Sequence, residues 1–137
     1  MNKMADIVLI NPRTEKEKKY KKGSGFTAPL GLVSIGTYLE KRGYSVKVID
    51  TMVENDYMNQ IEKELKDAKL IGLSVMSAQI PHALEISKKL RKYKIPVIWG
   101  GIHPILFPEQ TCKSEFVDYI TFGEGEESVY RLMQFLN

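Results

Sequence analysis

LIGLSVM, residues 70–76, is apolar at nearly every position. An antiparallel strand with one wet face alternates apolar and polar residues, whereas a parallel strand covered by helices on both faces is apolar throughout. The stretch therefore predicts a central strand of a parallel sheet with helices packed on both sides.

The sequence on either side of this stretch alternates between strand and helix patterns. Short apolar or alternating runs indicate strands, and apolar residues at helical spacing with a charged opposite face indicate helices. Gly43 and Pro12 mark the ends of such segments. The strands are predicted at residues 6–11, 45–50, 70–76, 96–101 and 117–123, and the helices at residues 30–42, 56–66, 79–93, 106–112 and 124–136.

Repeated strand–helix units imply right-handed crossovers and a parallel sheet. The predicted fold class is α/β: one Rossmann-like (flavodoxin-like), doubly wound domain with a five-stranded parallel sheet in the order 2-1-3-4-5. A chain of 137 residues suits one domain, so residues 1–137 are assigned to a single unit.

Composition excludes several classes of protein. No run approaches the roughly 18 apolar residues of a membrane span, and the N-terminus MNKMADIVLINP is not a signal peptide. The lone Cys112 cannot form an internal disulfide, so a cytoplasmic location is expected. It also excludes a zinc or iron–sulfur site built from several cysteines of this chain, and no metal ligands are assigned.

The stretch EKEKKYKKGSG, residues 15–25, holds much of the positive charge. Such runs are usually solvated loops, and the alternative is a segment that attracts anions. No aromatic stacking platform accompanies the lysines, so nucleic acid is not an expected partner, and neither is a membrane.

Ligands of such sheets bind at the carboxyl ends of the strands, near the switch point between strands 1 and 3. The aspartate of a receiver domain is replaced by Ser74, and Pro12 interrupts the run of N–H donors that a flavin phosphate loop needs. Neither a dinucleotide fingerprint nor a P-loop is present, and no catalytic residue set can be assembled. A nucleotide-binding enzyme is therefore the least favoured interpretation.

What remains at the strand ends is small residues. Ser74 follows the third strand, and Gly100 and Gly101 follow the fourth. Bare backbone lets a large flat or elongated group approach closely. The alternative is that the two glycines only form a tight turn.

The stretches VLINPR, APLGLVSIGTYLEKRGYSVKVID, IGLSVMSAQ, VIWGGIHPILFPE and ITFGEGEES extend this picture. Together they resemble the cobalamin-binding domain that precedes the radical S-adenosylmethionine domain in B12-dependent radical enzymes. The resemblance covers nearly the whole chain in the family's order. It implies that Ser74, Gly100 and Gly101 accommodate the nucleotide tail of cobalamin.

The resemblance implies roles for further residues, each with a structural alternative. It implies that Pro12, Leu30 and Gly31 form an apolar floor near the corrin, with Met76 beside it; ordinary core packing is the alternative for the first three. Glu124 and Glu126 would accept hydrogen bonds from ligand amides, or only favour a helix N-terminus. The full set of candidate cofactor-binding residues is Pro12, Leu30, Gly31, Ser74, Met76, Ser77, Gly100, Gly101, His103, Gly123, Glu124 and Gly125.

The broad cobalamin-binding fold often carries a cobalt-ligating histidine after strand 1, and this chain has none there. That absence is usual in the radical subgroup and implies cobalt without such a ligand. His103 is then expected to contact the corrin rim or tail, or to bond the loop backbone. His82 is expected to be structural or a rim contact.

A radical S-adenosylmethionine domain needs Cys-x3-Cys-x2-Cys for its [4Fe–4S] cluster, and this chain has only Cys112. The expected function is therefore the cobalamin-binding module of a radical S-adenosylmethionine enzyme, a methyltransferase, with no catalysis by this part alone. S-adenosylmethionine and the cluster would belong to a missing downstream domain. The alternative function is a cofactor-free docking or substrate-recognition domain.

Overall fold

The computed structural model describes residues 4–14 and 29–137. Its centre is a five-stranded, all-parallel sheet in the order β2-β1-β3-β4-β5, which confirms the predicted topology. The lysine-rich stretch of residues 15–25 lies outside the described residues. The strands are β1 Ile7–Asn11, β2 Val46–Asp50, β3 Leu70–Ser74, β4 Val97–Gly100 and β5 Tyr119–Ile120.

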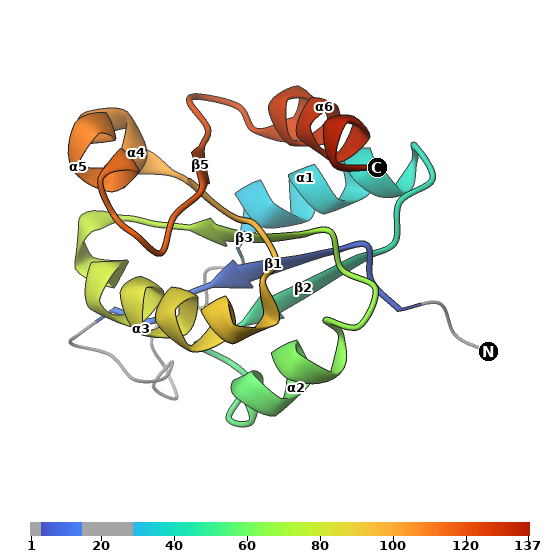
Figure 1. Cartoon of the computed structure of the whole chain (residues 1–137), viewed down its shortest axis with the longest axis horizontal. Helices are drawn as coiled ribbons and strands as arrows, with labels where there is room; N and C mark the ends of the chain where they lie inside the picture. Colours follow the sequence, from blue (N-terminus) through green and yellow to red (C-terminus); the bar gives the residue numbers. More distant parts are fainter. Residues whose placement is uncertain (1–3, 15–28) are drawn as a thin grey trace.

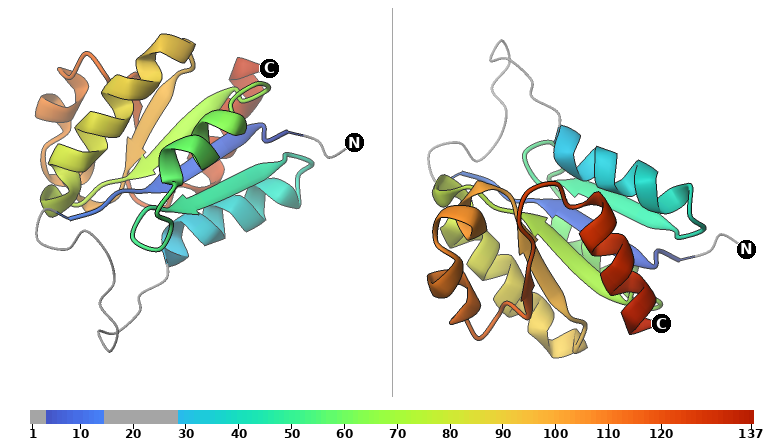
Figure 2. Two further views of the ribbon diagram at one scale, coloured as in Figure 1. Left: turned by 90° about the horizontal axis from the view of Figure 1, so that it is seen from below. Right: turned by 90° about the horizontal axis from the view of Figure 1, so that it is seen from above.

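Helices cover both faces of this sheet (Figures 1 and 2). α1 (Leu30–Glu40) and α6 (Glu126–Leu136) lie on one face. α2 (Tyr57–Lys63) and α3 (Ile80–Leu90) lie on the other, and 3-10 turns at Ser77–Gln79 (η1) and Arg91–Tyr93 (η2) flank α3. Two short helices, α4 (Ile102–Leu106) and α5 (Pro108–Cys112), follow β4.

The side-chain alternation of β1 divides the core into two layers. Ile7 and Leu9 pack with α1 and α6, whereas Val8 and Ile10 pack with α2 and α3. All four side chains are at most 2% exposed. β1 and β3 are therefore buried on both faces, which is why both read as continuous apolar runs.

The region after β4 differs from the prediction of one helix at residues 106–112. It forms α4 and α5, separated by Phe107, and places His103 and Pro104 inside α4. Pro104 falls in the first turn of α4, where a missing N–H breaks no helical hydrogen bond. The glycines and the proline of Gly-Gly-Ile-His-Pro are typical of a loop, which is why no helix was predicted there. A helix forms nevertheless, because its first turn accepts Pro104.

The last strand and last helix are shorter than predicted. Asp118 N–H and Thr121 N–H still donate to β4 carbonyls, but Gly123 has φ +67° and turns the chain away. α6 starts at Glu126, so the prediction that Glu124 lies in its first turn is wrong. Glu124 instead lies in the connection between Gly123 and Gly125.

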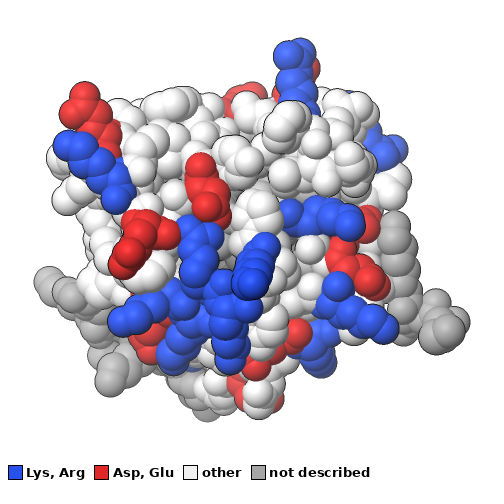
Figure 3. Space-filling view, viewed as in Figure 1, with Lys and Arg blue, Asp and Glu red and all other residues white. Residues whose placement is uncertain are grey.

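The surface over α3 and η2 is strongly basic, as Figure 3 shows. The exposed or half-exposed cations there are Lys88, Lys89, Arg91, Lys92 and Lys94. Among the described residues, no helix is long and apolar enough to cross a membrane.

Candidate functional site

A cavity of about 280 Å³ opens between the sheet and the helices α1 and α6. It reaches from the carboxyl ends of β3 and β4 down toward the middle of the sheet. The residues that line it are Leu9, Gly31, Leu32, Ile35, Gly72, Leu73, Ser74, Ile98, Gly100, Gly101, Thr121, Gly123, Glu124, Gly125, Glu126 and Val129.

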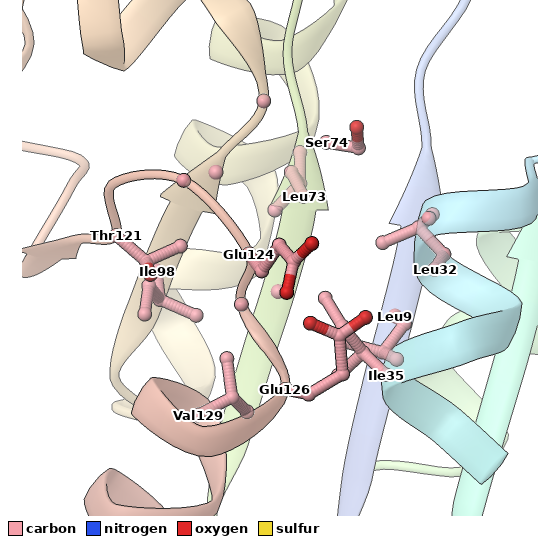
Figure 4. A pocket seen from close by; sticks show the side chains of 16 residues that line it. Leu9, Leu32, Ile35, Leu73, Ser74, Ile98, Thr121, Glu124, Glu126 and Val129 are labelled. Atoms are coloured by element: carbon pink, nitrogen blue, oxygen red, sulfur yellow. The ribbon is translucent and has the colours of Figure 1, made fainter. Parts of the chain in front are cut away.

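The deep part of the cavity is apolar. Figure 4 shows Leu32 and Ile35 of α1 on one side, and Ile98 and Val129 on the other. Gly72 lies in the middle of β3, and a Cβ there would come within 2.8 Å of Leu9 Cδ2. The missing side chain at Gly72 therefore lets Leu9 and Ile98 pack closely over β3 at the floor of the cavity, and the lining suits a flat, apolar group.

The outer part of the cavity is polar. It carries the hydroxyl of Ser74 and the carboxylates of Glu124 and Glu126 (Figure 4). Ser34 Oγ donates a hydrogen bond to Glu126 Oε1 at 2.8 Å, which ties α1 to α6. Two carboxylates accept hydrogen bonds from amide or hydroxyl groups and repel anions, so they favour a ligand with N–H or O–H donors.

Gly100 and Gly101 line the cavity, but the protein itself occupies the position of their missing side chains. A Cβ on Gly100 would lie 2.9 Å from Thr121 Cγ2. A Cβ on Gly101, whose φ is +95°, would lie 2.9 Å from both Val75 N and Val75 O. A bulky residue at Gly101 would therefore collide with the backbone after β3 before it could fill the groove.

Seven of the candidate residues from the sequence line this cavity: Gly31, Ser74, Gly100, Gly101, Gly123, Glu124 and Gly125. Each comes from the carboxyl end of a strand or from the helix that follows it. A Cβ on Gly31 or Gly123 would meet no atom of the described residues within 4 Å. The fold thus brings together residues as far apart in the chain as Gly31 and Gly125.

The other five candidates lie outside the cavity lining. Leu30 and Met76 are 72% and 46% exposed, at the start of α1 and after β3. The carbonyl of buried Pro12 accepts a hydrogen bond from Gln79 Nε2 at 2.7 Å. Ser77 and His103 bond each other, as described next.

His103 is only 4% exposed and belongs to the packing of α4. Its Nδ1 lies 3.2 Å from Ser77 Oγ, its ring packs against Phe107, and its N–H donates to Val75 O. Burial lowers the pKa of His103, so the neutral ring is favoured. The structure thus places His103 where it joins α4 to the connection after β3.

His82 lies on the opposite side of the sheet and uses both ring nitrogens. Nδ1 accepts a hydrogen bond from Arg13 N–H at 2.7 Å, and Nε2 lies 3.0 Å from the Tyr57 hydroxyl. His82 and His103 are the two histidines of the sequence, and the ring of each lies within hydrogen-bond distance of a neighbouring group. Among the described residues, no group of three or more His, Cys, Asp or Glu side chains could hold a metal ion.

Sequence reasoning missed the residues that give the cavity its depth, above all Gly72. A glycine inside the apolar run LIGLS was a usable signal, because glycine in a buried strand marks a close approach or a gap. Thr121 was missed as well. Its side chain is 8% exposed, and its hydroxyl oxygen is buried without a hydrogen-bond partner among the described residues.

A family model described as "B12 binding domain" matches residues 22–133. A cytidylyl-2-hydroxyethylphosphonate methyltransferase of Streptomyces wedmorensis is 30% identical over 134 residues, which covers 81% of this chain and 25% of the relative. An anaerobic magnesium-protoporphyrin IX monomethyl ester cyclase of Synechocystis sp. (strain ATCC 27184 / PCC 6803 / Kazusa) is 28% identical over 113 residues, which covers 77% of this chain and 22% of the relative. The chain therefore spans about a quarter of the length of these relatives.

Proposed function

Since the chain belongs to the B12 binding domain family, we propose that it holds cobalamin with the nucleotide tail in the cavity between the sheet and helices α1 and α6. The observation that carries this proposal is the cavity itself. It opens at the sheet edge where parallel α/β folds bind ligands, and a Cβ on Gly31 or Gly123 in its lining would meet no described atom within 4 Å.

The lining fits the chemistry of such a tail. The tail ends in a flat aromatic base, for which Leu9, Ile98 and Val129 offer an apolar surface. Ribose hydroxyls and corrin amides carry the donors that Glu124 and Glu126 can accept. The phosphate of the tail is anionic, so it is expected to lie away from these carboxylates and nearer Ser74.

We further propose that the cobalt receives no histidine from this chain. His82 is held by Arg13 and Tyr57, and His103 is buried against Ser77 and Phe107. Ligation by either would require breaking these contacts. The nucleotide tail and the corrin amides would then supply most of the polar contacts with this chain.

The enzyme to which such a module belongs is proposed from the relatives. From the sequence resemblance we propose a cytoplasmic radical S-adenosylmethionine enzyme, and because one relative is named as a methyltransferase, we propose methyl transfer as its reaction. When bound, the cobalt would carry the methyl group, and this chain would hold and orient the cofactor without catalysis of its own. S-adenosylmethionine and a [4Fe–4S] cluster would belong to a downstream domain, because the single Cys112 cannot supply three cluster ligands.

Exposed apolar side chains favour a partner domain at the same edge. Met76, Ile102, Ile105, Phe107 and Phe122 are each at least 45% exposed. An apolar surface beside a cavity mouth suits contact with a corrin or a second domain. The same surface also supports the second candidate function, a docking domain that binds no cofactor.

Corrinoid titration separates the two candidates. Hydroxocobalamin and cobinamide, which lacks the nucleotide tail, would be titrated into the purified chain and followed by absorption and gel filtration. We expect one cobalamin per chain, bound at least about tenfold more tightly than cobinamide, which corresponds to about 1.4 kcal/mol from the tail. Equal affinities would exclude tail binding, and no retention of either compound would favour the docking domain.

A further inference from the structure

Arg13, at the start of the connection from β1 to α1, is held from three directions. Its backbone N–H donates to His82 Nδ1 of α3, and its Nε donates to the carbonyl of Thr51 at 2.7 Å. Its guanidinium lies 4.8 Å from the centre of the Tyr57 ring in α2, and one terminal nitrogen bonds the Glu54 carbonyl at 3.3 Å. None of these five residues lines the cavity.

The contact between Arg13 and His82 fixes the state of the imidazole. A backbone N–H can donate to Nδ1 only when that nitrogen carries a lone pair. The proton of the neutral ring is then on Nε2, which donates to the Tyr57 oxygen 3.0 Å away. His82 also packs edge-on against the Tyr57 ring, at an interplanar angle of 88°.

A proton on Nδ1 would set two N–H donors against each other. The groups around His82 add to this effect. Burial is the main cause that lowers the pKa of His82 below its ordinary value of 6.5; Arg13 and Lys89 lower it further, and Glu85 acts in the opposite direction. The neutral, hydrogen-bonded form is thus the one that the folded protein favours.

We propose that Arg13 and His82 form a proton-sensitive catch on the β1–α1 connection. Neutral His82 holds the Arg13 backbone against α3, and protonation of His82 releases it. The proposal concerns the folded chain itself and does not depend on any cofactor.

The catch is linked to the residues beside the cavity through Gln79. Gln79 Nε2 donates to the carbonyl of Pro12, the residue before Arg13, and to Asn11 Oδ1 at 3.0 Å. Gln79 Oε1 accepts from Met76 N–H at 2.8 Å, two residues after the cavity residue Ser74. Release of Arg13 would therefore loosen a link between the exits of β1 and β3.

Two matched variants test the catch in the chain without ligand. His82→Asn keeps an acceptor near the position of Nδ1 but does not titrate, whereas His82→Phe removes the acceptor. The readouts are the Arg13 amide shift, its hydrogen exchange corrected for intrinsic pH dependence, and the ring nitrogen shifts of both histidines, from pH 8 to pH 5.

In the wild type we expect the chemical shift of the Arg13 amide to change with the same pH midpoint as the His82 ring. Its protection from hydrogen exchange should fall at least about fivefold, because one hydrogen bond is lost. His82→Asn should keep the high-pH behaviour throughout, and His82→Phe the low-pH behaviour. If a variant does not fold, the wild-type titration decides alone. The proposal would be overturned if the chemical shift and protection of the Arg13 amide did not change as His82 titrates, or if they changed with the midpoint of His103 instead.

Discussion

At the scale of single residues, two glycines near the cavity have different physical roles. Gly72 has an ordinary strand conformation, and its missing side chain makes room for the side chains of Leu9 and Ile98, which would lie 2.8 Å and 3.5 Å from a Cβ there. Gly101 has φ +95° and lets the chain after β4 pass against Val75. The sequence predicts that a Gly-Gly pair matters but does not distinguish a gap from a close backbone contact, because that depends on what packs opposite.

Gly101→Ala is expected to destabilise the fold rather than only block a ligand. The new Cβ would meet two backbone atoms at 2.9 Å, in a conformation that non-glycine residues rarely adopt. We expect a loss of about 2 kcal/mol or more in the free energy of unfolding, measured with urea. Gly31→Ala is the matched control, since Gly31 lies in a helix and its Cβ would meet no described atom within 4 Å; a similar loss there would contradict this account.

Stability should also fall in mild acid. His82 and His103 both have a lowered pKa, with burial as the largest cause, so between the folded and unfolded pKa values the unfolded chain binds more protons. The contribution of these two histidines to the free energy of unfolding is fully present above the unfolded pKa of about 6.5, and it is lost as pH falls below that value. Urea unfolding from pH 8 to pH 5 should show this fall in stability, and the fall should be smaller in His82→Asn. A midpoint urea concentration that does not change across this pH range would contradict the prediction.

At the scale of elements, buried strands were easier to predict than short helices. β1 and β3 are covered on both faces, so their sequences are continuous apolar runs whose meaning does not depend on context. α4 has five residues and contains His103 and Pro104, so neither periodicity nor composition marks it. Its position is set by tertiary contacts such as His103 N–H to Val75 O.

β3 also supplies the variant that separates cavity from fold. Valine suits a strand, but Gly72→Val would place its side chain against Leu9 and fill the deep part of the cavity. We expect cobalamin affinity to fall at least about tenfold while cobinamide affinity is unchanged, because only the tail needs this space. Gly72→Ala serves if valine prevents folding, and equal losses for both corrinoids would contradict the proposed tail position.

At the scale of the whole molecule, the sheet separates the two regions to which the proposals assign a role. Helices α1 and α6 lie on one face of the sheet, and α2 and α3 on the other (Figure 2). The first pair lines the cavity, and the second pair supplies Tyr57 and His82 to the Arg13–His82 catch. The strand order and the edge at which the site lies could be predicted, because local patterns and crossover handedness determine both. The depth of the cavity could not, since it depends on how Ile98 of β4 and Val129 of α6, far apart in sequence, lie opposite Ile35 of α1.

The most direct test of the central claim is a crystal structure of the chain with bound hydroxocobalamin. We predict the nucleotide base between the sheet and α1 and α6, in contact with Leu9, Gly72, Ile98 and Val129, with neither histidine bonded to cobalt. A corrinoid at another edge of the sheet, or one whose base lies outside an unchanged cavity, would contradict the account.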